Sequence, residues 1–244
     1  MIDTIVIEER FRGPPRSGNG GYVAGKFAEL LGLPERDVEV TLRSPIPLDT
    51  PMNVVHAEGL TTVMDGETLI AEVRPAEFTL DIPALPDWDK VRVAEPQSYA
   101  FAENINPLLP GQRGFHPICF CCGAEHEDGL NVFAAPIDDA AQVAAVWETR
   151  PAWGEADGLL PASYLWTALD CPGQFAWRAA GVRTGMLGRI TGRILDRPRA
   201  GTTLLVTAWP IEVEGKKHFA GSAIHTESGE LVARALSIWI GRRD

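Results

Sequence analysis

The first half of the chain combines one helical hydrophobic pattern with several strand patterns. In the segment GYVAGKFAELLG, residues 21–32, apolar residues recur at the spacing of one helix face. Asn19 stands at the expected N-cap and Gly32 at the expected C-terminal stop. Asp65-Gly66 is a typical hairpin turn. The strands that alternation and β-branched residues predict are 2–9, 37–47, 51–66 and 66–80.

The second half repeats this order of elements. Its predicted helix is GLLPASYLWTALDCPGQFA, residues 158–176, which is apolar on nearly every side and holds one carboxylate near its middle, Asp170. A helix that is apolar all round must be buried on most sides. The segments GETLIAEV and GELVARAL end the two halves in matching positions. The strands predicted here are 129–137, 141–149, 185–198, 201–215, 216–228 and 229–241.

A duplicated unit explains this repeated order better than one irregular domain does. We therefore predict an α+β fold with two tandem units, each a curved antiparallel sheet wrapped around a long apolar helix. Residues 82–114 are dense in proline and lack a sustained period, so we interpret them as a connector. The predicted units are residues 1–110, with the connector at its end, and residues 111–244.

Composition and charge narrow the class of protein. The 244 residues are 45 % hydrophobic and 23 % charged, which is ordinary for a globular protein. The formal net charge of −11 argues against a nucleic-acid-binding surface, which needs a basic field. The chain shows no secretion signal and no apolar run of membrane-spanning length, so we expect a cytoplasmic protein without a membrane span.

The tandem pattern and the two helix starts resemble the hotdog-fold acyl-CoA thioesterases, specifically the double-hotdog proteins with two units in one chain. Many single-unit members carry His-Gly-Gly at the helix start and an Asp further along the helix. Here the corresponding segments are Asn19-Gly20-Gly21 and Pro161-Ala162-Ser163, with Asp170 nine residues after Pro161. The segment CFCCGAEHEDGL, residues 119–130, looks like the cysteine-rich segment that precedes the first strand in many such units.

The resemblance implies an active site between the two units. One unit supplies backbone N–H groups at its helix start, and the other supplies the acid. Carried over by position, Gly21 with Gly20 would be the donor and Asp170 the acid. At the reciprocal site the donor would be Ser163, but the acid position falls on Ala28, so one active site per chain is expected. Neither helix start has the family's His.

Thioester hydrolysis explains why these residue types suit the site. Negative charge develops on the carbonyl oxygen, and N–H groups at a helix N-terminus stabilise it. A carboxylate opposite can activate water or attack directly. Asp170 also has a structural interpretation, as the N-cap of a new helical turn at Pro172. The loop GPPRSGNGG, residues 13–21, either contacts substrate through Asn19 and Gly20 or is simply a turn into the helix.

Two clusters of side chains are candidates for binding a phosphate or a metal ion. Arg197 and Arg199, in the segment RILDRPRAG, are the densest group of arginines and suit the phosphates of coenzyme A, although solvated surface charge is the common role. A second cluster has zinc-type residues but not the usual paired C-x₂-C arrangement, so apolar packing or inert thiols are preferred and neither metal nor cofactor is predicted. Its members are His116, Cys119, Cys121, Cys122 and His126.

These observations lead to one predicted function and two alternatives. The first is an acyl-CoA thioesterase, or a hydrolase of another acyl thioester, and the resemblance implies a homodimer. An alternative is a non-catalytic protein that binds acyl-CoA or lipid on the same fold. A minor alternative is a hydratase or dehydratase, which needs His paired with an acid. No His lies on either predicted central helix or in the loops leading into them.

Overall fold

The structure, a computed structural model, describes residues 4–102, 116–137 and 142–241. In this part of the chain no helix is both long enough and apolar enough to cross a membrane. The helices are α1 (Gly20–Glu29), α2 (Trp88–Ala94), α3 (Ala162–Ala168) and α4 (Cys171–Ala179), with 3-10 turns η1 (Glu9–Phe11), η2 (Glu95–Gln97) and η3 (Pro151–Trp153). The strands are β1 (Thr4–Ile5), β2 (Asp37–Leu42), β3 (Met52–Ala57), β4 (Leu60–Asp65), β5 (Thr68–Ala76), β6 (Ala135–Pro136), β7 (Val143–Glu148), β8 (Leu187–Ile194), β9 (Thr203–Glu214), β10 (Lys217–His225) and β11 (Leu231–Ile240).

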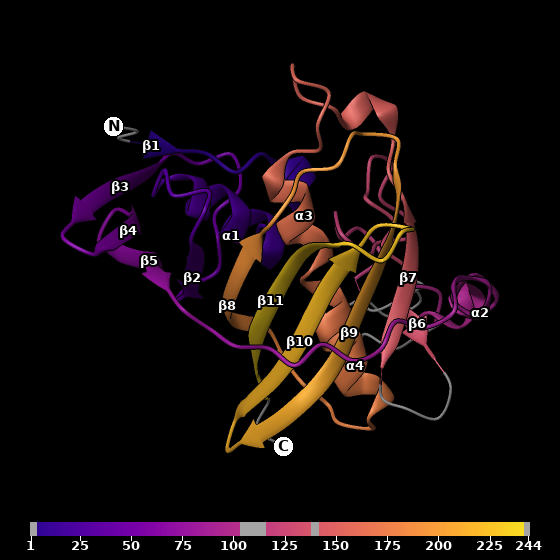
Figure 1. The fold of residues 1–244 in the computed structure, drawn as a ribbon. Helices are drawn as coiled ribbons and strands as arrows, with labels where there is room; N and C mark the ends of the chain where they lie inside the picture. The colour runs from indigo at the N-terminus through magenta and orange to yellow at the C-terminus, as the bar shows by residue number, and fades with distance from the viewer. Residues whose placement is uncertain (1–3, 103–115, 138–141, 242–244) are drawn as a thin grey trace.

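The described strands form a single antiparallel sheet in the order β1-β3-β4-β5-β2-β8-β11-β10-β9-β7-β6. The two halves meet where β2 pairs with β8 and Val40 lies opposite Ile190. Outward from this junction, both halves have the same order of strands. The strand that follows the central helix comes first (β2 or β8), the last strand of the half comes next (β5 or β11), and the earlier strands follow in reverse chain order. Figure 1 shows the two sets of strands on either side of β2 and β8. This repeated topology confirms the predicted α+β architecture.

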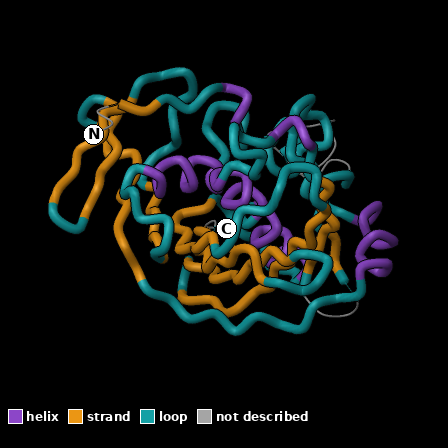
Figure 2. The backbone as a smooth tube through the Cα atoms, turned by 45° about the horizontal axis from the view of Figure 1, so that its top comes forward, coloured by secondary structure: helices purple, strands orange, loops and turns teal. Residues whose placement is uncertain are grey.

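The core lies where the helices rest on the sheet. α1 packs along α3, while α4 lies on β9 and β10. Figure 2 shows these helices gathered at the centre of the molecule, with the strands around them. Phe27 of α1 and Leu165 of α3 are fully buried. A Cβ at Gly192 of β8 would lie 2.8 Å from the ring of Trp166, so a larger residue there would displace the indole. Apolar burial of this kind is the main force that holds a helix on a sheet.

The second central helix is not continuous, contrary to the prediction for residues 158–176. It is divided into α3 and α4, and between them Asp170 adopts φ −83° and ψ −82°. Pro172 explains the break, because proline has no N–H to donate to the carbonyl of Ala168 one turn earlier. Proline is tolerated in the first turn of a helix, and Pro172 lies in the first turn of α4.

The predicted connector contains regular structure that its prolines concealed. Residues 88–97 form α2 and η2, and Val91 of α2 belongs to one buried apolar cluster with Ala144 of β7 and Leu205 of β9. Before α2 the chain crosses the second half's strands (Figure 1), and the guanidinium of Arg234 lies 4.8 Å from the Phe78 ring centroid. The predicted boundary between residues 110 and 111 lies outside the described residues.

Most predicted strands are confirmed, and the exceptions have local causes. Residues 51–66 form two strands, because Gly59 at φ +71° makes a turn between β3 and β4. Only Ala135–Pro136 of the predicted strand 129–137 is a strand. Before it, the Leu130 and Val132 N–H groups bond the carbonyls of Phe120 and Cys121. Among the described residues of 2–9, only Thr4–Ile5 is a strand.

Candidate active site

The start of α1 is organised by Asn19. Its side-chain Oδ1 accepts a hydrogen bond from the N–H of Tyr22 at 2.9 Å, which confirms the predicted N-cap. The residue is buried, so its amide Nδ2 group points into the protein interior rather than to water. The capping bond fixes the side chain in the orientation that lets Nδ2 reach the other half of the molecule.

The carboxylate of Asp170 meets this helix start from the second half. Its Oδ2 accepts hydrogen bonds from the Gly21 N–H at 2.9 Å and from the Asn19 amide at 3.1 Å. Oδ1 is buried and has no hydrogen-bond partner among the described residues. Asp170 does occupy the N-cap position of α4, but its side chain makes no capping hydrogen bond there. The carboxylate of Asp170 therefore joins the two halves of the molecule rather than capping α4.

Glycine at position 21 is required by this contact. A Cβ there would lie 2.6 Å from Asp170 Cβ and 2.6 Å from the backbone oxygen of Trp166, which is closer than real atoms approach. At Gly25, one turn along α1, a Cβ would lie 2.7 Å from Ser163 Cα. The two central helices therefore cross at backbone distance, and this closeness lets a main-chain N–H of α1 reach Asp170.

Burial has a chemical consequence for the acid. Removal from water raises the pKa of Asp170 to about 7, although the hydrogen bonds from the Gly21 N–H and the Asn19 amide act in the opposite direction. A carboxylate with a pKa near neutrality is a stronger base than one in water. Strongly shifted carboxylates of this kind are common in active sites.

A cavity of about 770 Å³ lies beside Asp170. Its walls are largely apolar, and Leu42, Ile46 and Leu187 are among the side chains that form them. Charged and polar residues interrupt this apolar wall. They are Asn19, His116, Asp170, Gln174, Arg16, Arg43, Ser17 and Ser44, and Gly20, Cys119 and Cys171 line the cavity with them. An apolar cavity with a few convergent polar groups is typical of a small-molecule site.

Four of the predicted site residues are thus brought together: Asn19, Gly20, Gly21 and Asp170. The other three lie elsewhere. The guanidinium of Arg197 bonds the carbonyl of Leu160 at 2.8 Å and pairs with Glu155 and Asp157. Ser163 is buried against Gly25, and Arg199 forms an isolated bridge with Leu159.

A second cavity, of about 410 Å³, is lined by Ala28, Glu29 and Arg197. Ala28 is the residue that falls on the acid position of the reciprocal site, but Ser163, the donor expected there, is not among the described residues that line this cavity. The expectation of one active site per chain remains a prediction.

Sequence reasoning missed several residues that belong to the first cavity. Gln174 follows Asp170 by one helical turn, is buried, and donates from Nε2 to the carbonyl of Gly185 at 2.7 Å. Its signal in the sequence is a polar residue four positions after the acid in an otherwise apolar helix. Arg43 carried no such signal, because its local pattern does not distinguish it from other arginines at strand ends.

Solved structures with the same fold exist, although sequence comparison finds no relative. No protein-family model and no curated protein matches the chain. Among solved structures, a conserved protein of unknown function with a hot dog fold from Alicyclobacillus acidocaldarius aligns over 99 % of this chain and 93 % of its own, with TM-score 0.60 and 11 % identity. The chain has a double hotdog fold.

Other double-length structures share this hotdog fold. A tesB protein of Mycobacterium avium subsp. paratuberculosis aligns over 95 % of this chain and 90 % of its own, with TM-score 0.57 and 14 % identity. A putative thioesterase II of Thermobifida fusca aligns over 98 % and 92 %, with TM-score 0.56 and 15 % identity. At these identities the likeness shows the hotdog fold alone, and activity depends on the residues of the site itself.

Proposed function

We propose that the protein hydrolyses an acyl thioester, and specifically an acyl-CoA. One observation carries the proposal: a buried carboxylate from one hotdog unit faces the glycine start of the other unit's helix, at the wall of an apolar cavity. The Thermobifida fusca neighbour is named a putative thioesterase II, which agrees with this class of reaction.

Asp170 is the proposed base. Its Oδ2 is held by Gly21 and Asn19, while Oδ1 is buried and has no partner among the described residues, so Oδ1 is the oxygen proposed to bind the attacking water. Oδ1 takes a proton from that water, whose oxygen attacks the thioester carbonyl carbon. The tetrahedral intermediate then expels the thiolate, which takes up a proton. The products are a carboxylic acid and a free thiol.

The N–H of Gly20 is the proposed donor to the carbonyl oxygen. It is the first N–H of α1, and such groups have no acceptor within their own helix. Gly20 lines the cavity, and Asp170 Oδ2 would lie 3.5 Å from a Cβ placed on it, so this donor and the acid share one small region. The dipole of α1 adds favourable potential for the negative charge that develops on the oxygen.

The cavity's remaining features suit the two ends of an acyl-CoA. Its apolar walls match an acyl chain, and Arg16, exposed at the cavity, carries charge suited to a phosphate. Arg43 is already paired with Glu72. Arg16 is therefore the better candidate for coenzyme A.

The homodimer and the cytoplasmic location expected from the sequence stay predictions. Light scattering of the purified protein measures its oligomeric state.

The decisive experiment is hydrolysis of a panel of acyl-CoAs by wild type, Asp170→Asn and Asp170→Ala. The matched control is Asp157→Asn, the same substitution at an exposed carboxylate that pairs with Arg197. We expect both Asp170 variants to lose roughly 10²–10⁴-fold in kcat, which is what a general base contributes. The control should keep wild-type activity. Unchanged hydrolysis in the Asp170 variants contradicts the assignment.

The same panel tests both alternatives. If wild type hydrolyses none of the acyl-CoAs but each raises its melting temperature saturably, the protein is a binding module. The structure places His116 at the cavity that holds Asp170, which gives the hydratase alternative an imidazole that the helices and their leading loops lack. A 2-enoyl-CoA therefore belongs in the panel. Water addition to it without thioester cleavage would favour the hydratase.

A further inference from the structure

The sulfur atoms of three cysteines converge beside the candidate active site. The Sγ atoms of Cys119, Cys122 and Cys171 all lie within 4.8 Å of one another, and the three residues are buried. Two come from the cysteine-rich segment, whereas Cys171 comes from the start of α4. We propose that these three thiols bind a divalent cation of the zinc class.

The spacing of the sulfurs suits such a cation. A zinc–sulfur bond is about 2.3 Å, so two sulfurs on a tetrahedral zinc lie roughly 3.8 Å apart. The Sγ atoms of Cys119 and Cys171 are 3.7 Å apart. The other two pairs lie within 4.8 Å, so they need to close by at most about 1 Å to reach the tetrahedral spacing.

The backbone of the cysteine-rich segment forms a tight turn that presents two of the ligands. Cys119 and Cys122 are separated by two residues, which is the usual spacing of a pair of zinc ligands. The N–H of Gly123 bonds the carbonyl of Cys119 at 2.8 Å, and a Cβ at Gly123 would lie 2.4 Å from the Cys119 nitrogen. Only glycine permits this turn. The sequence alone did not reveal the pair, because Cys121 interrupts the spacing and Cys171 is distant in the chain.

Asn19 supplies outer support for the cluster. Its Nδ2 group lies 3.6 Å from the Sγ of Cys119 and 3.8 Å from the Sγ of Cys171. Donors of this kind stabilise the negative charge of thiolate ligands and fix their orientation. The side chain is itself held by its capping bond to the Tyr22 N–H, so these contacts need no rearrangement.

Sulfur ligands decide the class of metal. Thiolates select zinc and other soft cations, while magnesium and calcium prefer oxygen. Binding releases the three thiol protons to solvent and involves no electron transfer. The bound cation would tie α4 to the cysteine-rich segment. This structural role does not require the proposed hydrolysis, and either proposal can fail alone.

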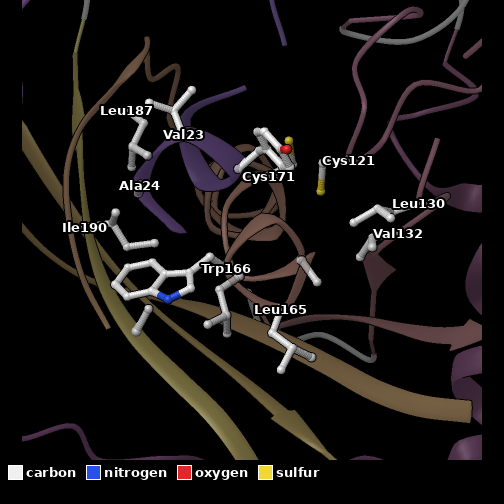
Figure 3. Close-up of a cluster of buried hydrophobic side chains, with 14 of the residues drawn as sticks. Val23, Ala24, Cys121, Leu130, Val132, Leu165, Trp166, Cys171, Leu187 and Ile190 are labelled. Atoms are coloured by element: carbon white, nitrogen blue, oxygen red, sulfur yellow. The ribbon is translucent and has the colours of Figure 1, made fainter. Parts of the chain in front are cut away.

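The chain offers a matched control for the test. Cys121 is also buried, but it is not one of the three clustered sulfurs. Figure 3 shows it in the apolar core near Leu130 and Val132. Cys121→Ser and Cys122→Ser thus make the same chemical change at neighbouring positions, and only the second removes a proposed ligand.

Metal content measured by mass spectrometry tests the proposal, after full-length protein is incubated with zinc under reducing conditions and then gel-filtered. We expect about one zinc per chain in wild type and Cys121→Ser, with at least a tenfold loss in Cys122→Ser. A chelator should lower the melting temperature of wild type and of Cys121→Ser, but not that of Cys122→Ser. If Cys122→Ser does not fold, cobalt-loaded wild type should still show sulfur-to-cobalt charge-transfer absorption. Metal-free wild type, cobalt without that band, or equal zinc loss in Cys121→Ser overturns the proposal.

Discussion

Asp170 Oδ2 accepts a hydrogen bond of 2.9 Å from the main-chain N–H of Gly21, across 149 positions of sequence. The bond joins the two hotdog units at the backbone of one and the side chain of the other. Because it uses a main-chain donor, the contact tolerates no side chain at the donor position. It also leaves the second carboxylate oxygen of Asp170 without a partner among the described residues.

Gly21→Ala should abolish the contact. The new Cβ would meet Asp170 Cβ and the Trp166 oxygen at 2.6 Å, so α1 and the acid must separate. We expect a loss of about 1–3 kcal/mol in the free energy of unfolding, the usual cost of overpacking. Thioester hydrolysis should fall at least tenfold. Chemical denaturation and initial rates, measured on the same preparation, check both expectations.

Gly25→Ala is the matched control for that substitution. It introduces a comparable clash, 2.7 Å from Ser163 Cα, one turn further from Asp170. We expect a similar loss of stability but retained hydrolysis at a temperature where both variants remain folded. Equal activity in the two variants would show that the Gly21 contact has no part in the reaction.

Asn19→Ser separates the capping role of Asn19 from its contact with the acid. Serine is also a good N-cap, so the cap itself is kept and only the lost hydrogen bond to Asp170 should lower the free energy of unfolding. It lacks the amide that bonds Asp170 Oδ2 at 3.1 Å. A hydrogen bond to a charged group is worth about 1.5–3 kcal/mol, so kcat should fall roughly tenfold or more. Steady-state kinetics with a saturating acyl-CoA measure this effect.

Asn19→Ala provides the comparison, since alanine neither caps α1 nor donates to Asp170. It should lose about 1 kcal/mol of stability in addition to the kinetic defect. If the serine variant keeps the wild-type kcat, the amide contact only maintains structure and Asn19 is not a positioning residue.

Arg16→Ala should weaken binding of the coenzyme A part of the substrate. An exposed ion pair contributes at most about 1 kcal/mol, so KM for an acyl-CoA should rise roughly two- to fivefold. The same acyl group on N-acetylcysteamine, which has no phosphate, should show no change in KM. Added salt should shrink the difference between wild type and variant, because it screens exposed charges.

Arg197→Ala distinguishes the two cavities. Arg197 lines the reciprocal cavity and is paired with Glu155 and Asp157. We expect its removal to leave KM for the acyl-CoA unchanged. A rise in KM for Arg197→Ala, with none for Arg16→Ala, would place the phosphates at the arginine cluster that the sequence suggested.

Local patterns in the sequence determined much of the fold. The Asn19 cap, the α1 helix and most strands were predictable because each depends on neighbouring residues and on the period of the apolar positions. The repeated order of elements in the two halves then predicted the tandem architecture. Failures occurred where proline dominated: α2 was too short and too close to prolines to show a period, and Pro172 divides the second central helix.

Only the tertiary structure decided what the chemically reactive residues contact. The sequence left Asp170 with two interpretations, because a helix pattern does not state what lies across a packed interface. Close packing of α1 against α3 places the acid beside Gly21, and the position of the cysteine-rich segment beside the start of α4 brings Cys119 to Cys171. The tertiary structure also pairs Arg197 with Glu155 and Asp157, away from Asp170. These relationships depend on close contacts between distant segments, which local periodicity does not encode.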